Sequence, residues 1–307
     1  MVNLSPATVI AWRAIITPKF FVRFFGYDGK DGATKHSGLV LKLQKSLEII
    51  ASHVGTSAAT LRISPPSEPA LPKGDPPSTF LVYGATQLLL RTVLDQRIWS
   101  VPQVSFETYP FESNVIPPII LCLAGYICPD DNTVVNAVKS AWLQPLAKTQ
   151  LVEILLTFDS VSFSGAEAPK LARAAIQKMI DSVRSELLDF RSPGGAPSPR
   201  WNIYVTSPTT RIAAWPKLQE YMYELTYPSI LSGTGIPRSL FVCTLCHSSN
   251  HPRGLCPFPD IQGWNGPQHA ERNNDSTTRE FGRGRGRGWA GAGASAARPS
   301  ERTRYPN

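Results

Sequence analysis

The stretch Cys243-Thr244-Leu245-Cys246, followed by His251 and Cys256, decides how this chain is organised. Two, four and four residues separate the successive cysteine and histidine side chains. Three thiolates and one imidazole suit a tetrahedral Zn²⁺ ion, and so short a loop buries too little apolar surface to fold alone. Metal binding supplies about 10–16 kcal/mol of folding free energy in isolated zinc modules. We therefore predict that Cys243, Cys246, His251 and Cys256 bind Zn²⁺.

Turn-forming residues surround the histidine. Asn250 and Gly254 lie on either side of His251 and adopt left-handed backbone conformations at low cost, as a tight chain reversal around a metal requires. The alternative interpretations are a disulfide between two of the thiols and a chance spacing. His247 is a rival ligand, but its place directly after Cys246 favours a solvated turn position.

The spacing Cys-x2-Cys-x4-His-x4-Cys resembles that of the zinc knuckles in retroviral nucleocapsids, in Gag-like proteins of retroelements and in some host RNA-binding proteins. The wider run of residues 241–259, with 263–267 behind it, is similar to the Gag-like proteins of fungal retroelements. This resemblance implies a nucleic-acid partner for the knuckle.

The chain departs from that family at three positions of the knuckle. The family often has an aromatic residue after the first cysteine and glycines after the second cysteine and before the histidine, where this chain has Thr244, His247 and Asn250. Threonine cannot stack on a base, so we expect stacking from three aromatic residues nearby. These are Phe241, Phe258 and Trp264.

The charge of the chain is concentrated at its C-terminal end. The formal net charge is +8, and residues 281–307 hold six arginines against Glu301, a net +5. Residues 281–289 alternate glycine with arginine between two aromatic rings, a composition that pairs with phosphates and stacks on bases with little regard to sequence. We expect residues 266–307 to be disordered and to bind nucleic acid, with a merely solubilising tail as the alternative. The expected contacts are Arg283, Arg285, Arg287 and Trp289.

Composition also predicts the domains and the compartment. The chain has 307 residues, 42% of them hydrophobic, and its 28 prolines gather in a few stretches, which favours ordered domains joined by linkers. Few cysteines and no signal peptide or membrane span favour an intracellular protein, without distinguishing cytoplasm from nucleus. The predicted regions are an aromatic and helical region 1–55, a proline-rich linker 56–78, an α/β body 79–232, the knuckle 241–259 and the tail 266–307.

The predicted fold class of the body is α+β. The predicted order of its elements is β-α-β-β-α-β. The strand-like runs are 80–83, 104–111, 119–127 and 151–158, and the helices are at 87–99 and after Asp131. The RNA-recognition motif and other ferredoxin-like folds share this order, and we expect extra helices, including one over 168–190, around it. The expected sheet has few exposed rings, so a scaffold or protein contact is as consistent with it as a platform for bases.

Two N-terminal segments each allow two interpretations. The aromatic run of residues 20–27 favours a buried strand over a surface that stacks on nucleic acid. Apolar residues recur at three- and four-residue steps over 37–54, which predicts a helix. This helix and the one at 168–190 are core elements or, alternatively, surfaces for self-association.

The predicted function is binding of single-stranded nucleic acid, with RNA favoured over DNA, by a zinc-dependent Gag-like protein. We find no catalytic constellation, because only His251 among the five histidines has partners at a suitable spacing. The alternatives are a self-assembling structural protein with nucleic acid as cargo, and a host RNA-processing adaptor whose knuckle binds protein.

Overall fold

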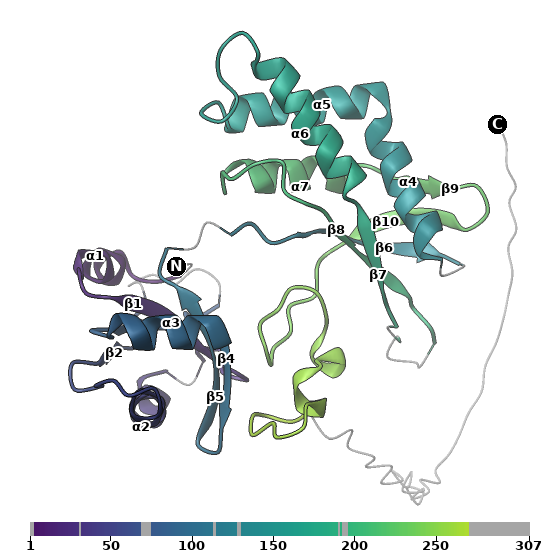
Figure 1. Cartoon of the computed structure of the whole chain (residues 1–307). Helices are drawn as coiled ribbons and strands as arrows, with labels where there is room; N and C mark the ends of the chain where they lie inside the picture. Colours follow the sequence, from purple (N-terminus) through teal and green to yellow (C-terminus); the bar gives the residue numbers. More distant parts are fainter. Residues whose placement is uncertain are drawn as a thin grey trace, which may run out of the picture. The chain divides into compact units, whose positions relative to one another are not determined.

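The computed structural model describes residues 3–30, 32–68, 75–112, 115–127, 130–189, 191 and 196–269, and the side chains of 32–34 are outside this description. These residues form two antiparallel sheets with helices, followed by the segment that contains the predicted knuckle (Figure 1). None of the described helices combines the length and the apolarity that crossing a membrane requires. The arginines and Trp289 predicted to bind nucleic acid lie in 270–307, outside the described residues.

The first sheet has the strand order β2-β3-β1-β5-β4 (Figure 1). Its strands are antiparallel, with β1 in the centre. The elements of this part are α1 (Pro6–Ala14), β1 (Lys19–Phe24), α2 (Gly32–His53), β2 (Arg62–Ser64), β3 (Thr79–Tyr83), α3 (Gln87–Gln96), β4 (Ile98–Val101) and β5 (Val104–Pro110).

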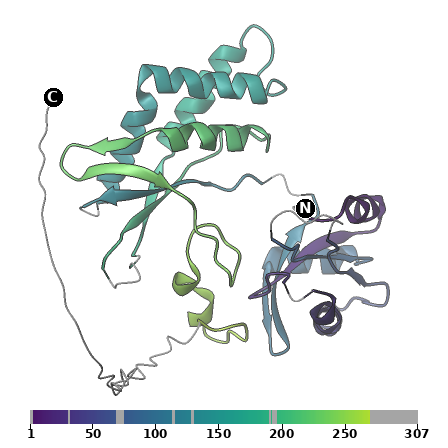
Figure 2. The ribbon, with the colours of Figure 1, turned by 180° about the vertical axis from the view of Figure 1, so that it is seen from behind.

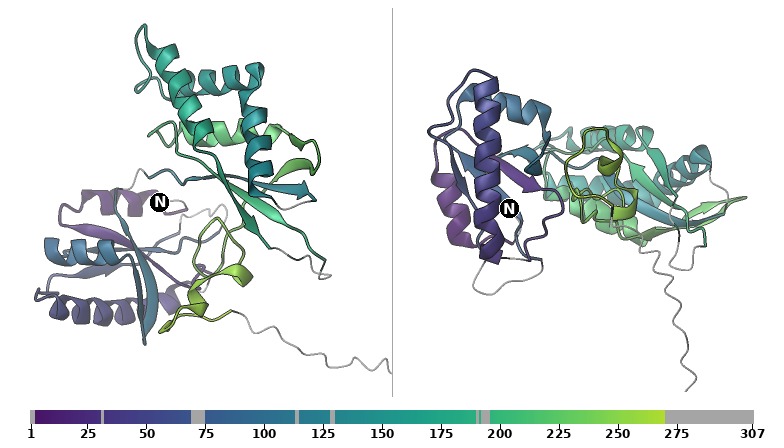
Figure 3. Two further views of the ribbon diagram at one scale, coloured as in Figure 1. Left: turned by 45° about the vertical axis from the view of Figure 1, so that its right-hand side comes forward. Right: turned by 90° about the horizontal axis from the view of Figure 1, so that it is seen from below.

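Strand β1 buries the side chains of one face, and those of the other face are half-buried. Phe20, Val22 and Phe24 alternate along one face and are fully or almost fully buried in a core to which α2 and α3 contribute. The long helix α2 is seen along its length in the right-hand view of Figure 3. The opposite face carries Phe21, which packs near Trp12 of α1, at 5.9 Å between ring centroids. The aromatic N-terminal run is therefore a buried strand, as predicted.

The second sheet has the strand order β7-β8-β6-β10-β9, with helices on one side of it (Figure 2). Its core joins β6 and β8 to the helices through buried residues such as Leu123, Trp201 and Ile176. The elements are β6 (Ile119–Tyr126), α4 (Asp131–Leu143), α5 (Pro145–Phe158), α6 (Ala168–Asp181), β7 (Arg184–Leu188), β8 (Arg200–Tyr204), α7 (Ala214–Glu224), β9 (Tyr227–Ser229) and β10 (Gly233–Arg238).

The two sheets share one connection pattern. In each, the first strand is central, a helical segment leads to a hairpin on one side, and another helix leads to two strands on the other side. Adding five to each strand number of the first sheet gives the order of the second. This repeated pattern was not predicted from the sequence, which shows no matching repeat of residues.

The order β-α-β-β-α-β expected over residues 80–158 is not found as one sheet. The runs at 80–83 and 104–111 belong to the first sheet, whereas 119–127 belongs to the second. The predicted strand at 151–158 is instead the helix α5, which begins at Pro145 and buries Leu151, Val152 and Leu155 at helical spacing. A short apolar run does not by itself distinguish a buried strand from a buried helix.

The helix predicted over 168–190 also ends early. Helix α6 stops at Asp181, and residues 184–188 form the edge strand β7. The buried face of α6 contains Ala172, Ile176 and Met179, whereas Leu171, expected in the buried stripe, is 51% exposed. The stripe predicted for α2 is confirmed in the core at Leu43 and its neighbours, and the helix begins earlier than expected, at Gly32.

Candidate metal centre

The predicted ligands come together in one buried cluster. One ligand atom from each of Cys243, Cys246, His251 and Cys256 lies within 4.8 Å of the others, and all four residues are buried. The Cys246 Sγ and His251 Nε2 atoms are 3.3 Å apart. Ligand atoms on a tetrahedral zinc, at about 2.3 Å for sulfur and about 2.0 Å for nitrogen, are separated by roughly 3.5 Å. The cluster therefore fits a metal ion such as zinc.

Backbone hydrogen bonds fold the knuckle around this cluster. The Cys243 amide donates to the Ser248 carbonyl at 2.8 Å, and the His247 amide donates to the Cys243 carbonyl at 2.7 Å. The 3₁₀ turn η1 (Arg253–Leu255) then brings Cys256 to the cluster. The left-handed residue of the loop is His247, with φ +60°, and not Asn250 or Gly254 as the sequence suggested.

The orientation of the ligand histidine is set by its neighbour. His251 Nδ1 lies 2.6 Å from Asn250 Oδ1, an acceptor, so Nδ1 carries the proton and Nε2 presents its lone pair to the cluster. Ser248 Oγ donates to the same oxygen at 2.6 Å and holds it in place. An oriented histidine of this kind is typical of metal sites.

The thiols influence one another strongly. Hydrogen bonding from Cys246 lowers the pKa of the Cys243 thiol to about 3. The same hydrogen bond, together with burial, raises the pKa of Cys246, and burial raises the pKa of Cys256. The cluster thus favours one thiolate before any metal binds, and a bound cation would favour the deprotonated form of all three thiols.

His247 contacts the first sheet and is neither a rival ligand nor a solvated turn residue. Its Nε2 atom lies 3.1 Å from the Phe24 carbonyl oxygen at the end of β1. Burial, followed by the nearby Arg23 cation, lowers the pKa of His247. The neutral ring therefore donates to the first sheet, and His247 is not a ligand.

The knuckle docks against the first sheet through aromatic packing. Phe25, which follows β1 and is 7% exposed, lies 4.9 Å from the ring of Phe258 and 4.8 Å from that of Trp264. Phe258 and Trp264 stack on each other at 5.4 Å and an interplanar angle of 29°. All three candidate ligand cysteines belong to the same apolar cluster as Phe25. The metal centre is thus part of a packed core and not an isolated module.

Backbone contacts reinforce this docking. The Gly26 amide donates to the Leu245 carbonyl at 2.8 Å, and the Asn265 amide donates to Ser100 Oγ in β4 at 2.8 Å. Gly26 has φ +71°, and a Cβ at that position would meet Pro267 Cγ at 2.8 Å. A glycine is therefore required where β1 meets the knuckle.

The second sheet also contacts the knuckle segment. Asn202 of β8 donates through Nδ2 to the Asn250 carbonyl at 2.5 Å. Phe241 lies beneath the guanidinium of Arg200, at 4.6 Å from ring centroid to Cζ. Each of the three knuckle rings expected to stack on bases is thus half-buried against another part of the chain.

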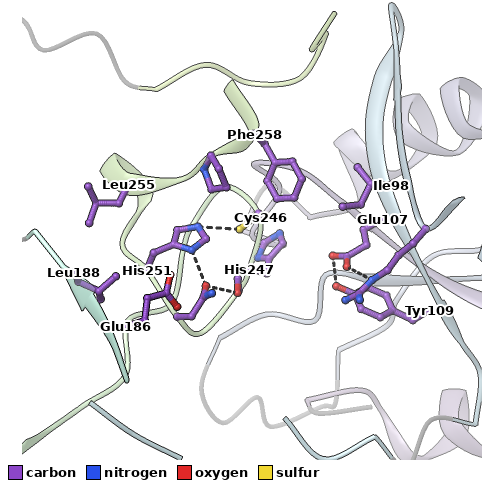
Figure 4. Close-up of a pocket in the computed structure, with 14 residues that line it drawn as sticks. Ile98, Glu107, Tyr109, Glu186, Leu188, Cys246, His247, His251, Leu255 and Phe258 are labelled. Carbon is purple, nitrogen blue, oxygen red and sulfur yellow. Dashed lines mark hydrogen bonds and ion pairs between the residues drawn. The ribbon is translucent and has the colours of Figure 1, made fainter. Parts of the chain in front are cut away.

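A cleft of about 520 Å³ opens beside the metal ligands (Figure 4). His251 and Cys246 lie in the knuckle wall, and Glu107 and Tyr109 lie across from them (Figure 4). Glu186 of β7 also lines this space. Sequence reasoning missed the cleft residues outside the knuckle, such as Arg97, Glu107 and Glu186, because they come from separate elements and no local spacing connects them. No protein-family model, curated protein or solved structure matches the chain.

Proposed function

We propose that this chain is a zinc-dependent protein that binds single-stranded nucleic acid, with RNA as the preferred strand, and that its activity is binding and not catalysis. The supporting observation is the buried set of three thiols and an oriented imidazole, whose spacing resembles a Gag-like zinc knuckle. Zn²⁺ held by Cys243, Cys246, His251 and Cys256 would fix the shape of the loop.

The repeated strand pattern is consistent with this proposal. Each sheet begins with its central strand and continues with a helical segment, two strands, a helix and two strands, an order similar to the β-α-β-β-α-β order of ferredoxin-like folds and of the RNA-recognition motif. The sheet surface that such motifs use for bases carries chain contacts here, because Phe21 packs with α1 and Phe25 with the knuckle. We therefore assign binding to the knuckle and to the basic segment 281–289, and not to an open sheet.

The basic segment supplies the electrostatic part of the proposal. Its three arginines carry +3 of the formal net charge of +8 and are expected to pair with phosphates without sequence preference. Each phosphate contact on a single strand should add about 0.7 to the slope of log affinity against log salt concentration.

The test combines zinc content with affinity in the same samples. Full-length wild type, Cys246→Ser and Cys122→Ser are compared for zinc per chain and for affinity to a labelled single-stranded RNA. Cys122 is a buried free cysteine of β6, so its variant controls for the loss of a core thiol.

We expect near-stoichiometric zinc in wild type and in Cys122→Ser, and a joint loss of zinc and RNA affinity in Cys246→Ser. Wild type that contains no zinc, or that binds RNA no better than a neutral control protein, would overturn the proposal. Equal affinity in the Cys246 variant would remove the knuckle from it.

A further inference from the structure

Arg97 occupies an unusual backbone conformation at the mouth of the cleft. It follows the last residue of α3 with φ +59° and ψ −50°, a region that side chains other than glycine rarely adopt. Among the described non-glycine residues only Asn3, Arg97 and His247 have positive φ, and two of them line this cleft. Such strain persists only where the surroundings enforce it.

The surroundings of Arg97 fix its side chain as well. Its Nε donates to Glu107 Oε1 at 2.7 Å, and the Tyr109 hydroxyl donates to the other oxygen of the same carboxylate. The guanidinium also lies over the Tyr109 ring, at 5.4 Å from its centroid. The Glu107 side chain is 11% exposed, whereas that of Arg97 is 61% exposed. A largely buried carboxylate thus orients a cation that faces solvent.

The cleft has an apolar wall and two carboxylates among its lining residues. Its volume of about 520 Å³ is in the range of small-molecule sites, about 300–1,000 Å³. Glu107 is largely buried and paired with Arg97, whereas Glu186 is exposed. A metal-loaded knuckle, with three thiolates and a neutral histidine on Zn²⁺, would have a net charge of −1. The apolar wall is made by Ile98, Leu188, Leu255, Pro257 and Phe258.

This distribution of charge selects how a nucleotide can enter. A phosphate beside Glu107 or Glu186 would face a carboxylate, whereas on Arg97 it would meet an exposed guanidinium, which suits phosphate oxygens. A base has no net charge, packs on apolar walls, and carries donors that carboxylates accept. The favourable arrangement is therefore base inside and phosphate at the rim.

We propose that this cleft holds one nucleotide of a bound single strand, with its base inside and its phosphate on Arg97. Glu107 acts as the positioning residue for that guanidinium. The inference rests on the proposed function and adds a phosphate contact on the first sheet, far in sequence from both the knuckle and the basic segment.

The main experiment compares salt dependence in three full-length, zinc-loaded proteins: wild type, Arg97→Ala and Arg91→Ala. Arg91 lies on the same helix, α3, with an exposed side chain outside the cleft, so it controls for the loss of one positive charge. Affinity for a labelled eight-nucleotide single-stranded RNA is measured between about 50 and 200 mM salt.

We expect Arg97→Ala to lower the slope of log affinity against log salt by about 0.7, the value for one phosphate, and to weaken binding about tenfold. Arg91→Ala should keep the wild-type slope. Equal slopes for Arg97→Ala and wild type would overturn the inference while leaving the proposed function intact. Absence of RNA binding in wild type would instead overturn both.

A second variant separates positioning from simple electrostatics. Glu107→Gln keeps the shape of the side chain and removes one negative charge, so general electrostatic attraction predicts tighter RNA binding. Loss of the carboxylate that orients Arg97 predicts weaker binding, which is the expected result, at unchanged zinc content. Tighter binding by Glu107→Gln would contradict the assigned role of Glu107 and with it the fixed phosphate contact.

Discussion

Replacing Phe25 with alanine tests whether the metal centre depends on its docking to the first sheet. Phe25 is 7% exposed and contacts both Phe258 and Trp264 edge to face. The substitution removes these contacts and leaves all four ligands in place. Because the ligands lie within a short stretch, we expect Phe25→Ala to keep its zinc and to loosen the knuckle from the sheet.

The magnitude follows from the contacts. Truncating a buried phenylalanine costs about 3–5 kcal/mol, and each aromatic pair accounts for about 0.5–1.5 kcal/mol beyond area burial. The hydrogen bonds from Gly26 to Leu245 and from His247 to Phe24 use backbone atoms at the sheet and remain possible. A loss of about 3 kcal/mol in docking free energy raises the population of the undocked knuckle by about 100-fold.

Hydrogen exchange measures this opening directly. Amides within residues 243–266 should exchange about 100-fold faster in Phe25→Ala than in wild type, while amides of the second sheet keep their rates. Phe21→Ala is the control, because Phe21 lies on the same strand face but packs with Trp12 and Phe111, away from the knuckle. Zinc per chain is determined in each sample.

Two results would refute the reasoning. Unchanged exchange over 243–266 in Phe25→Ala would mean that the aromatic contacts do not hold the knuckle. An equal acceleration in Phe21→Ala would mean that both variants destabilise the first sheet as a whole.

Three further predictions concern separate residues. Asn250→Ala removes the acceptor that orients the ligand histidine and should lower zinc affinity about 10- to 100-fold in chelator competition, so an unchanged affinity would contradict that orienting role. Burial lowers the pKa of His36 below its usual 6.5, so unfolding free energy should fall as pH drops from 6.5 towards the lowered value. Buried His247 adds a dependence of the same sign, so His36→Phe should reduce the pH dependence in urea titrations, and an unchanged dependence would assign it elsewhere. Gly84 has φ +75° and lies beside the Thr60 carbonyl, so Gly84→Ala should destabilise the fold by at least about 2 kcal/mol. Gly38 lies within α2 with open space around it, so Gly38→Ala should stabilise the fold slightly. Similar denaturation midpoints for the two variants would contradict this prediction.

The metal ligands could be predicted because their arrangement is local. Cys243 and Cys256 are close in sequence, so chain connectivity alone keeps the four side chains within reach of one ion. The docking of the same loop could not be predicted in this way. Phe25 carries no spacing signal toward Phe258, and the aromatic run around it predicted only a buried strand and not what that strand packs against.

The strand positions were predicted better than their partners. Residues 80–83 and 119–127 are strands as expected, but hydrophobic patterning specifies which face of a strand is buried and not which strand lies beside it. The error at 151–158 has a related cause. Helix α5 packs against α4, α6 and α7, so its apolar residues are not confined to one stripe, and the segment resembles a central strand.

The contact between His247 and Phe24 joins positions 223 residues apart, and this separation has a consequence for protein synthesis. At about 5–20 residues per second, a ribosome needs roughly 10–45 s to make the chain between them. The first sheet, which ends at Pro110, is complete in the nascent chain before the loop of residues 243–256 emerges, and during that interval Phe258 and Trp264 do not yet cover Phe25. The Phe25 side chain is therefore more exposed in the nascent chain than in the finished protein. Exposed apolar surface of this kind is what a chaperone would bind.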